Sequence, residues 1–518
     1  MKSFFLTTAI DYVNSIPHIG TAYEKIGADI LARYHRMKGD VVWFQMGNDE
    51  HSVNVKKAAE NEKLSPKAYC DGMRPKFESV WQKLSLSYNH FIQTSDPRHH
   101  EAVKKLFQRI YENGDIYEGD YEGLYCESCE AFYTEKDLTD GLCPQHQKPP
   151  THIKEKNFFF KLSKYADVLL EYIEKHPHFI LPAIRRNEIV NVIKGGLKDV
   201  SVSRSGFDWG IPLPLKSNHV VYVWFDALIN YITLIGYADD EANFKKWWPV
   251  NMHIIGKDIT RFHCVIWPAM LMSAGIALPQ TIFGHGFVYL KGEKMSKSLG
   301  NVVTPLDVID QFGPDALRYY LVRGNSFGDD GNFSWDDFIL RYNSDLANGL
   351  GNLVSRTAGM INRYFEGVLP VKSLTGSDLD LATKKEQIIN KVDQLLDPAK
   401  EGDIYFNRAL ENIWAYISEL DKYIDAQAPW TLAKEKKMDR LGEVLTTIAR
   451  SLFNVCALIK PFIPETAHKI WDLYGWQDKI PFDELNFDAA TWRDDLGVCI
   501  KKGAPALFPR IQIADQKS

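Results

Sequence analysis

The chain has 518 residues, 45% of them apolar and 25% charged, with a formal net charge of −6 and a pI near 6.2. This length is too great for a single hydrophobic core, so two to four domains are expected, and the composition is that of an ordinary soluble globular protein. The negative net charge excludes nucleic-acid binding driven by overall charge, although a local basic groove would serve equally well.

The N-terminal part alternates strand and helix signals. Residues 4–10 predict a buried strand, because the apolar run is too short and too soon polar for a signal peptide. Residues 22–38 predict an amphipathic helix and residues 41–46 the next strand. Strand, glycine-containing turn, helix and strand form the unit of a parallel doubly wound sheet, whose ligands bind at the carboxyl ends of the strands.

The turn after the first strand reads Pro-His-Ile-Gly-Thr, residues 17–21. It lies between a strand and a helix, where free backbone N–H groups and the helix dipole favour a phosphate. This turn is therefore a candidate nucleotide-binding site.

The 7 cysteines do not suggest a disulfide framework. The tetrad Cys126-x-x-Cys129 and Cys143-x-x-His146 has the paired-knuckle spacing of a closed tetrahedral zinc site. Four protein ligands leave no open position, so we expect the zinc to be structural. The alternative is a set of buried core cysteines beside a surface histidine. The other cysteines are scattered, which indicates a reduced, cytoplasmic chain.

Further along, residues 114–212 interrupt the strand–helix rhythm and suggest an insertion. Strand signals resume at residues 219–225, 252–256 and 281–284. Beyond about Asp336 long helical periodicities follow, with prolines between them, and predict an α-helical bundle: residues 345–365, 384–396, 405–426 and 439–459. No run of about 18 apolar residues suggests a membrane span, so we expect no membrane partner.

The run Lys294-Met-Ser-Lys-Ser places two ammonium groups three residues apart on a loop of small residues. Such a loop is suited to closing over a polyphosphate and neutralising charge as a phosphoryl bond rearranges. Taken alone, this lysine- and serine-containing run would be interpreted as a solvent-exposed surface loop. Its pairing with residues 17–21 far upstream makes the functional interpretation the better one.

These two strings resemble the HxGH and KMSKS motifs of class I aminoacyl-tRNA synthetases. Other strings, spread over the whole chain, are similar to motifs of the methionyl-tRNA synthetase family: Tyr222-Val-Trp-Phe-Asp-Ala-Leu, Gly256-Lys-Asp-Ile-Thr-Arg-Phe-His, Val200-Ser-Val-Ser-Arg, Asn352-Leu-Val-Ser-Arg and Gln427-Ala-Pro-Trp. In that family an amino acid and ATP form an aminoacyl adenylate and pyrophosphate. The acyl group then moves to the 3′-terminal adenosine of a tRNA.

The resemblance implies a Rossmann-type α/β catalytic domain with a parallel doubly wound sheet, interrupted by a zinc-binding connective insertion and followed by an all-α bundle. The expected boundaries are 1–113 and 213–290 for the catalytic halves, 114–212 for the insertion, 291–340 for the KMSKS and tRNA-stem region, and 341–518 for the anticodon-binding bundle. We expect a monomer, because no appended dimerisation domain is apparent.

For the substrates, the resemblance implies a methionine pocket lined by Ile10, Tyr12, Asp49, Trp224, Ala227, Leu228, Tyr231, Ile259 and His263. A thioether gains from aromatic faces, and a carboxylate at Asp49 suits the substrate ammonium group. The hydroxyl of Tyr12 and the ring of His263 are the candidates for polar contact with sulfur. Core packing is the alternative interpretation for each aromatic residue taken alone.

The resemblance assigns ATP to His18, Gly20, Thr21, Glu24, Gly256, Asp258, Lys294 and Lys297. The catalytic set would be His18, Gly20, Thr21, Lys294, Ser296 and Lys297, acting by positioning and charge stabilisation without a protein nucleophile. Mg²⁺ would accompany ATP, held mainly by phosphates and water. An ion pair between Arg204 and Asp258 is expected to shape the floor of the site, with a purely structural salt bridge as the alternative.

For the RNA partner, the resemblance assigns Asn352, Arg356, Pro429 and Trp430 to the CAU anticodon of initiator and elongator tRNA(Met). Single-stranded bases are read by stacking on aromatic planes and by bonds to their pairing edges. Asn352 and Arg356 are four residues apart and share a helix face. The alternative for Trp430 is a core residue of the bundle.

One residue departs from the family pattern, because position 21 is Thr where HxGH usually ends in His. A hydroxyl donates a hydrogen bond but is shorter and never cationic. This keeps one alternative open, a tRNA-binding paralogue that has lost activation. A cysteine-specific enzyme would bind its zinc near the nucleotide, and a leucine-specific enzyme would need a large editing domain.

Overall fold

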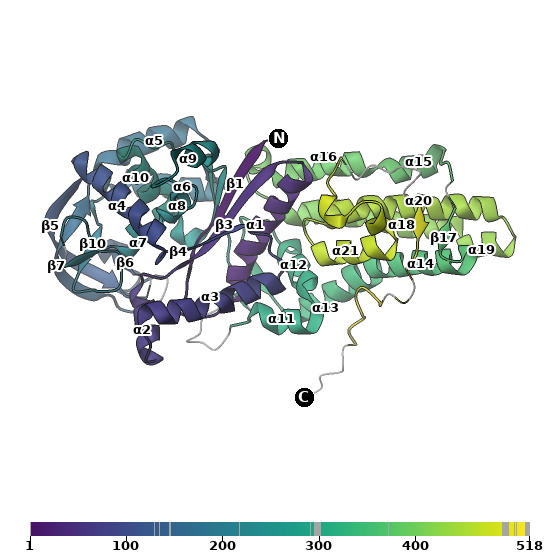
Figure 1. Ribbon diagram of the computed structural model, residues 1–518, viewed down its shortest axis with the longest axis horizontal. Coiled ribbons are helices and arrows are strands. Elements are labelled where there is room, and N and C mark those ends of the chain that lie inside the picture. The colour runs from purple at the N-terminus through teal and green to yellow at the C-terminus, as the bar shows by residue number, and fades with distance from the viewer. Residues whose placement is uncertain are drawn as a thin grey trace.

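The computed structural model is elongated, with an α/β part at one end and a helical part at the other (Figure 1). The structure describes residues 2–128, 130–133, 135–144, 147–216, 218–290, 292–294, 302–370, 372–488, 497–501, 503 and 505–512. The N-terminus lies at the junction between the two parts, beside strand β1.

The core of the α/β part is a parallel sheet with the strand order β2-β3-β1-β12-β13-β8, and β4 pairs with β3. The strands are β1 (Ser3–Thr8), β2 (Asp11–Tyr12), β3 (Val41–Asp49), β4 (His90–Gln93), β8 (Ile180–Leu181), β12 (Met252–Gly256) and β13 (Thr281–His285). The strands predicted at residues 4–10, 41–46, 252–256 and 281–284 are therefore confirmed.

Side chains of β1 alternate between two hydrophobic cores, as the two-residue period of a strand requires. Phe4 and Leu6 join one core, and Phe5 joins the other. The first core also contains residues of α1 (Ile19–Met37) and α3 (Pro66–Lys83) and continues into the helical part. The second contains residues of α4 (Pro97–Glu112), α7 (Val223–Ala227), α8 (Asn230–Thr233), α9 (Glu241–Trp247) and α10 (Trp267–Ser273). Helix α2 (Val53–Asn61) follows β3.

The predicted insertion contains an antiparallel sheet of order β6-β5-β7-β9. Its strands are β5 (Ile116–Cys126), β6 (Ala131–Tyr133), β7 (Thr151–Phe160) and β9 (Val200–Ser201). However, β8, which lies within the predicted boundaries 114–212, extends the parallel sheet by pairing with β13. Helices α5 (Ala166–Lys175) and α6 (Ala183–Lys194) flank β8. The chain thus returns to the central sheet earlier than the sequence pattern suggested.

The strand predicted at residues 219–225 is confirmed for residues 219–221 and wrong for residues 223–225. Strand β11 (His219–Val221) pairs antiparallel with β10 (Ser203–Ser205), outside the parallel sheet. From Val223 the chain is helix α7. Periodicity cannot separate a buried strand from a buried helix in so short an apolar run.

The junction between the two parts contains β14 (Val288–Leu290), β15 (Glu293–Lys294), β16 (Gly331–Phe333), α11 (Pro305–Phe312) and α12 (Pro314–Arg323). On α12, the fully buried guanidinium of Arg318 pairs with Asp29 of α1 at 2.7 Å. The same group donates to the carbonyls of Pro461 and Phe462 in the helical part. One buried cation thus bonds both parts of the molecule.

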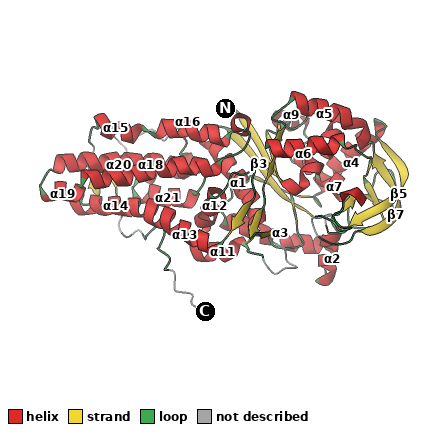
Figure 2. Ribbon diagram, turned by 180° about the vertical axis from the view of Figure 1, so that it is seen from behind, coloured by secondary structure: helices red, strands yellow, loops and turns green. Residues whose placement is uncertain are grey.

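The C-terminal part is helical, as predicted (Figure 2). Its helical segments are α13 (Trp335–Arg341), the π-helical Tyr342–Gly351, α14 (Asn352–Phe365), α15 (Gly376–Thr383), α16 (Lys385–Leu396), α17 (Pro398–Glu401), α18 (Phe406–Gln427), α19 (Pro429–Lys434), α20 (Met438–Ile459) and α21 (Pro464–Leu473). A short antiparallel pair of β17 (Val368–Leu369) and β18 (Val498–Cys499), which the sequence analysis did not predict, lies beside them.

Helix α20 is the core of this helical part. Among the described residues, it is the one helix long and apolar enough to cross a membrane, and 89% of its most apolar window is buried inside the protein. It contacts α15, α18, α19 and α21. Its hydrophobicity therefore serves the packing of the bundle.

Candidate active site

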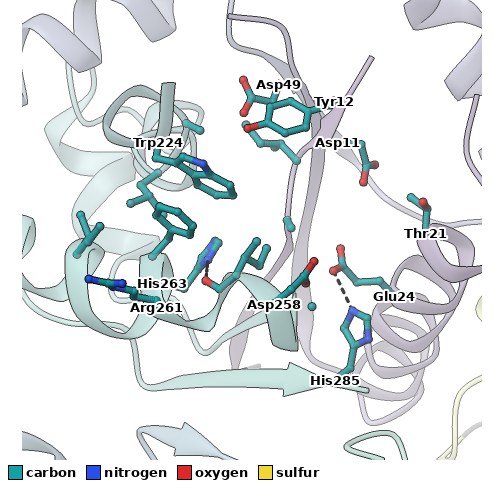
Figure 3. A pocket seen from close by; sticks show the side chains of 18 of the residues that line it. Asp11, Tyr12, Thr21, Glu24, Asp49, Trp224, Asp258, Arg261, His263 and His285 are labelled. Atoms are coloured by element: carbon teal, nitrogen blue, oxygen red, sulfur yellow. Dashed lines mark hydrogen bonds and ion pairs between the residues drawn. The ribbon is translucent and has the colours of Figure 1, made fainter. Parts of the chain in front are cut away.

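A cavity of about 680 Å³ opens at the carboxyl ends of the central parallel strands (Figure 3). Ala9 follows β1, Gly256 ends β12 and His285 ends β13, and all three line the cavity. This is the edge at which open α/β sheets bind their ligands.

The cavity brings together the predicted substrate residues from distant parts of the sequence. Its lining includes the whole predicted methionine set: Ile10, Tyr12, Asp49, Trp224, Ala227, Leu228, Tyr231, Ile259 and His263. It also includes His18, Gly20, Thr21, Glu24, Gly256 and Asp258 of the predicted ATP set. Lys294 ends β15, and Ser296 and Lys297 lie outside the described residues.

One side of the cavity is built from aromatic rings, and we call Trp224, Phe262, Tyr231 and His263 the aromatic wall. The indole of Trp224 stacks on Phe262 with ring centroids 3.8 Å apart and planes 8° from parallel. Tyr12 meets the same indole edge-on, at 6.4 Å. These contacts fix the planes of the rings, which favours an apolar and polarisable ligand.

Hydrogen bonds set the protonation of His263 within this wall. Its Nδ1 faces the carbonyl of Ile259 at 3.0 Å, so this nitrogen carries the hydrogen. The Tyr231 hydroxyl, 2.7 Å from Nε2, is then the donor to the ring. Burial lowers the pKa of His263 to about 4, so the ring is neutral. Both ring nitrogens are engaged, which leaves no free N–H on His263 for a ligand.

Two unpartnered polar atoms mark one end of the cavity. Within the described residues, Tyr12 Oη and Asp49 Oδ1 are buried without a hydrogen-bond partner. Burial, together with the negative charges of Asp226, Glu130 and Glu50, raises the pKa of Asp49 well above its ordinary value. A cationic ligand would relieve this carboxylate, so the position suits an ammonium group.

The opposite side carries charges, and we call Asp11, Glu24 and His285, with Lys25 behind them, the ionic wall. Glu24 accepts from His285 Nε2 at 3.0 Å and from Lys25 Nζ at 2.6 Å. Lys25 also bonds Asp11 at 3.1 Å and the Ala9 carbonyl at 2.7 Å. Figure 3 shows Asp11 and Glu24 facing Trp224 and His263 across the cavity.

The charges of the ionic wall depend on one another. Burial pushes the pKa of Glu24 upward, but Lys25 and His285 hold it below its ordinary value. Burial raises the pKa of Asp11 to about 6, against the opposing effect of Lys25. The ring of His285 faces the Gly286 carbonyl through Nδ1 at 2.7 Å, so Nδ1 carries a hydrogen, and its Nε2 lies 3.0 Å from Glu24.

The N-terminus of α1 completes this side of the cavity. His18 is the N-cap residue, and its Nδ1 accepts from the backbone N–H of Thr21 at 3.2 Å. Gly20 and Thr21 line the cavity in the first turn of the helix. Backbone N–H groups at such an end favour an anion, so this part of the cavity suits a phosphate.

Behind the aromatic wall, a buried carboxylate anchors helix α7. Asp226, next to the pocket residue Ala227, accepts from His51 Nδ1 at 2.7 Å and from His99 Nε2 at 2.6 Å. Burial alone would raise the pKa of Asp226, but the two histidines lower this pKa to about 2. His51 lies two residues after Asp49, which ends β3. The contact between Asp226 and His51 therefore holds helix α7 against the end of β3.

The predicted ion pair between Arg204 and Asp258 is wrong. Arg204 pairs with Glu155 of β7 at 3.2 Å, and its guanidinium lies over the Tyr125 ring at 4.4 Å. Arg204 belongs to β10, which packs on β7 in the connective part, whereas Asp258 follows β12 of the parallel sheet. Asp258 does line the cavity.

Two of the predicted zinc ligands, Cys126 and Cys143, belong to the described residues. Cys126 is 3% exposed at the end of β5 and Cys143 is fully buried, whereas Cys129 and His146 lie outside the described residues. Within the described part of the chain, no group of three or more His, Cys, Asp or Glu is arranged to hold a metal ion. Ser128 and Pro144, each next to a cysteine in the sequence, line the same cavity.

The predicted anticodon residues lie in the helical part. Arg356 of α14 pairs with Asp425 at 2.8 Å, and its guanidinium lies 5.2 Å from the centroid of the Trp430 ring. Trp430 is 45% exposed, which excludes the core interpretation. Pro429 begins α19 and is buried, and Asn352 is exposed one helical turn before Arg356. The surface presents an aromatic plane beside a cation.

The sequence analysis missed His285, Asp11 and Phe262. His285 ends β13, and its position at the carboxyl end of a predicted parallel strand was the available signal. Asp11 follows the first strand in the same way. Phe262 offered no signal, because its role comes from stacking on Trp224, which is far away in sequence.

Comparison with known families matches almost the whole chain. The family model described as tRNA synthetases class I (M) matches residues 4–152 and 145–358. The model described as the anticodon-binding domain of tRNA ligase matches residues 378–501.

Curated proteins and solved structures give the same result. The methionine–tRNA ligase of Caldanaerobacter subterraneus subsp. tengcongensis is 47% identical over 99% of this chain and 79% of its own length. That of Fusobacterium nucleatum subsp. nucleatum is 47% identical over 100% of this chain and 81% of its own length. Mycobacterium tuberculosis methionyl-tRNA synthetase in complex with methionyl-adenylate has a TM-score of 0.92 and 39% identity, covering 98% of this chain and 100% of that chain.

Proposed function

Because this chain belongs to the methionyl-tRNA synthetases, the methionine-specific class I tRNA ligases, we propose that its cavity binds methionine at the aromatic wall and ATP at the ionic wall. The enzyme activates L-methionine with ATP to methionyl-adenylate, releases pyrophosphate, and transfers the methionyl group to tRNA. The observation that carries the residue assignment is that the predicted methionine residues and the described predicted ATP side chains line one cavity of about 680 Å³.

At the aromatic wall, the thioether would lie among Trp224, Tyr231 and His263. The substrate ammonium would lie at Asp49, whose buried and unpartnered Oδ1 supports this assignment. With His263 and Tyr231 engaged by each other, the free hydroxyl of Tyr12 becomes the donor available to the ligand. The rings then hold the methionine carboxylate toward the nucleotide, which is catalysis by positioning.

At the ionic wall, the first turn of α1 with His18, Gly20 and Thr21 would hold the phosphates. The carboxylate of methionine attacks the α-phosphate, and pyrophosphate leaves. Lys294, Ser296 and Lys297 stay predicted contributors to charge stabilisation in this step. Mg²⁺ would be carried by the phosphates and water, because both oxygens of Glu24 are already bonded to Lys25 and His285.

We also propose a structural zinc ion held by Cys126, Cys129, Cys143 and His146. The burial of both described thiols, Cys126 and Cys143, and the lining of one cavity by Ser128 and Pro144 support it. Bound zinc would fix the turns that carry Ser128 and Pro144 at the cavity rim. Metal analysis of the purified protein tests the proposal, with about one zinc per chain expected and its loss in C126S but not in C499S, at the exposed Cys499.

For tRNA, we propose that the anticodon stacks on Trp430, with Arg356 and Asn352 reading base edges. The exposed indole and the adjacent guanidinium support this reading. Initiator and elongator tRNA(Met) would bind the same surface. A cytoplasmic location is proposed from the scattered cysteines of the sequence, which are typical of a reduced chain.

Methionine-dependent exchange of labelled pyrophosphate into ATP tests the cavity assignment, with a panel of other amino acids as controls. Exchange that requires methionine is expected. W430A should weaken aminoacylation while exchange is spared, and equal loss of both would assign Trp430 a structural role. The alternative of an inactive paralogue is not favoured, since the matched relatives are ligases over the whole chain.

A further inference from the structure

The segment His285–Val288 forms part of the ionic side of the cavity and is held in place by a loop from the junction. His285, Gly286, Phe287 and Val288 all line the cavity. Residues 326–331, which we call the brace loop, lie directly behind this segment. Neither the sequence motifs nor the catalytic roles described above involve the brace loop.

Backbone hydrogen bonds fasten the brace loop to the cavity segment. Gly286 donates to the carbonyl of Phe327 at 3.1 Å, and Gly331 donates to the carbonyl of Phe287 at 2.7 Å. The Phe287 N–H donates to Asp330 Oδ1 at 2.8 Å. A Cβ on Gly286 would lie 2.1 Å from the backbone oxygen of Asp329, so the two segments are in direct contact.

The brace loop also holds the next strand end of the cavity. Lys257, beside the predicted ATP residue Asp258, donates from Nζ to Asp330 Oδ2 at 2.7 Å. Asp330 therefore bonds two cavity segments at once, the one after β12 and the one after β13. This carboxylate therefore links the two segments to each other and to the brace loop.

On its other side, the brace loop is anchored to the helical part, at residues 403–406. Asp403 Oδ1 accepts from the N–H of Gly328 at 3.1 Å and from that of Ile404 at 2.6 Å. The Phe327 N–H donates to the carbonyl of Ile404 at 3.0 Å. A Cβ on Gly328 would lie 2.8 Å from Asp403 Oδ2 and 2.7 Å from Pro182, so no larger residue fits.

The side chain of Phe327 occupies the centre of this contact. It is fully buried, and its ring lies 5.3 Å from His285 and 5.1 Å from Phe406, measured between centroids. The position that a Cβ on Gly27 of α1 would take is 2.3 Å from the Phe327 ring. Phe327 thus packs against the cavity, the helical part and the helix that begins at His18.

We propose that the brace loop positions the ATP side of the cavity from the helical part, with Asp403 and Phe327 as positioning residues. Neither lines the cavity: Asp403 acts through the backbone of Gly328, and Phe327 acts through its ring contact with His285 and its carbonyl bond with Gly286. The inference deepens the proposed function, because it rests on the assignment of ATP to this wall. Misplacement of a binding segment by about 1 Å is enough to change rates by orders of magnitude.

The test compares two glycine substitutions in the full-length protein. G328A introduces the clash with Asp403 and Pro182, whereas G324A places a methyl group where no atom lies within 4 Å. In the exchange assay, G328A should raise the KM for ATP about tenfold and leave the KM for methionine within about twofold. G324A should change neither value, and unchanged values in a folded G328A protein whose hydrogen exchange at residues 281–290 is also unchanged would overturn the proposal.

A second pair of variants separates positioning from general stability. D403A removes the acceptor of both amides, whereas D403N keeps an Oδ1 that accepts from both, so D403N should restore the ATP KM. Hydrogen exchange of the peptide 281–290 supplies a readout independent of ATP, and D403A and G328A should accelerate it. Unchanged exchange in these variants overturns the positioning role. Accelerated exchange with an unchanged ATP KM instead overturns the assignment of ATP to this wall.

Discussion

The two walls of the cavity are held together by different physical interactions. The aromatic wall is held by ring stacking, as between Trp224 and Phe262. It is neutral, because the pKa of its one histidine, His263, lies at about 4. The ionic wall is a chain of ionisable side chains, in which His285, Glu24, Lys25 and Asp11 each bond the next. The first wall suits a thioether and the second suits a phosphorylated nucleotide.

The difference shows where each wall is vulnerable. Stacked rings lose affinity gradually as area is removed, because dispersion and burial are roughly additive. A buried charge chain loses stability abruptly, because each removal leaves the next charge without its partner. Substitutions in the ionic wall should therefore affect folding, and substitutions in the aromatic wall should affect methionine binding.

The largest expected effect is that of K25M. The substitution leaves the carboxylates of Asp11 and Glu24 buried without their cation, at a cost of about 3–5 kcal/mol in the free energy of unfolding. Urea unfolding measures the change. K38M, which removes a part-exposed pair with Asp393 at the end of the same helix, is the control and should cost less than about 1 kcal/mol. Equal losses in the two variants would contradict the comparison.

W224A should come next, and act on binding without unfolding the chain. Loss of the indole removes a large apolar contact, about 2–3 kcal/mol, which corresponds to a KM for methionine on the order of 30- to 150-fold higher. Exchange kinetics measure it. The KM for ATP should stay within a few-fold of wild type, and a parallel rise in both values would mean that the walls do not divide the substrates.

D226N probes the charge hidden behind the aromatic wall. The amide presents an N–H group to a histidine and should cost about 2 kcal/mol at pH 7. The folded protein binds the Asp226 proton more weakly than the unfolded chain, since the pKa is about 2 instead of 3.8. The stabilisation is therefore present above pH 4 and is lost as the pH falls toward 2.

The difference in stability between wild type and D226N should accordingly narrow from pH 5 to pH 3 in denaturant titrations. A stability difference that stays constant from pH 5 to pH 3 would show that the charge of the Asp226 carboxylate contributes nothing to stability. The difference in the free energy of unfolding between wild type and K25M, measured at the same pH values, gives the corresponding result for the ionic wall.

F262L should give the smallest effect. It removes the ring that stacks on Trp224 but keeps an apolar side chain, at a cost of about 1 kcal/mol and about fivefold in the KM for methionine. F287L, on the opposite side of the cavity, is the matched variant and should change the KM for ATP instead. If F262L and F287L changed the KM for the same substrate, the division of methionine and ATP between the two walls would be contradicted.

Long buried strands and long helices could be predicted from the sequence. The runs at residues 4–10 and 252–256 are apolar and bounded by turns, and the period of residues 439–459 fits a helix fully surrounded by others. Residues 219–225 could not be resolved, because a short apolar run fits a buried strand and a buried helix equally well. Strand β8 was missed because its two residues carry almost no pattern.

The candidate site was predictable where residues belong to motifs and not where they meet through tertiary packing. Trp224 and His263 were found in strings that resemble a family. The partner of Arg204 depends on the packing of β10 against β7, which sequence spacing does not reveal. His285 and Phe262 contribute through their neighbours in space, Glu24 and Trp224. The roles of Ser296, Lys297, Cys129 and His146 stay predictions.

The pairing of β1 with β12 has a consequence for synthesis on the ribosome. The bond from the Phe5 N–H to Asn251 spans 246 residues, so one edge of the first strand has no partner until half of the protein has emerged. At roughly 5–20 residues per second, this wait is on the order of 10–50 s. During that interval the nascent chain exposes the unpaired N–H and C=O groups of this strand edge, which are a template for pairing with another chain.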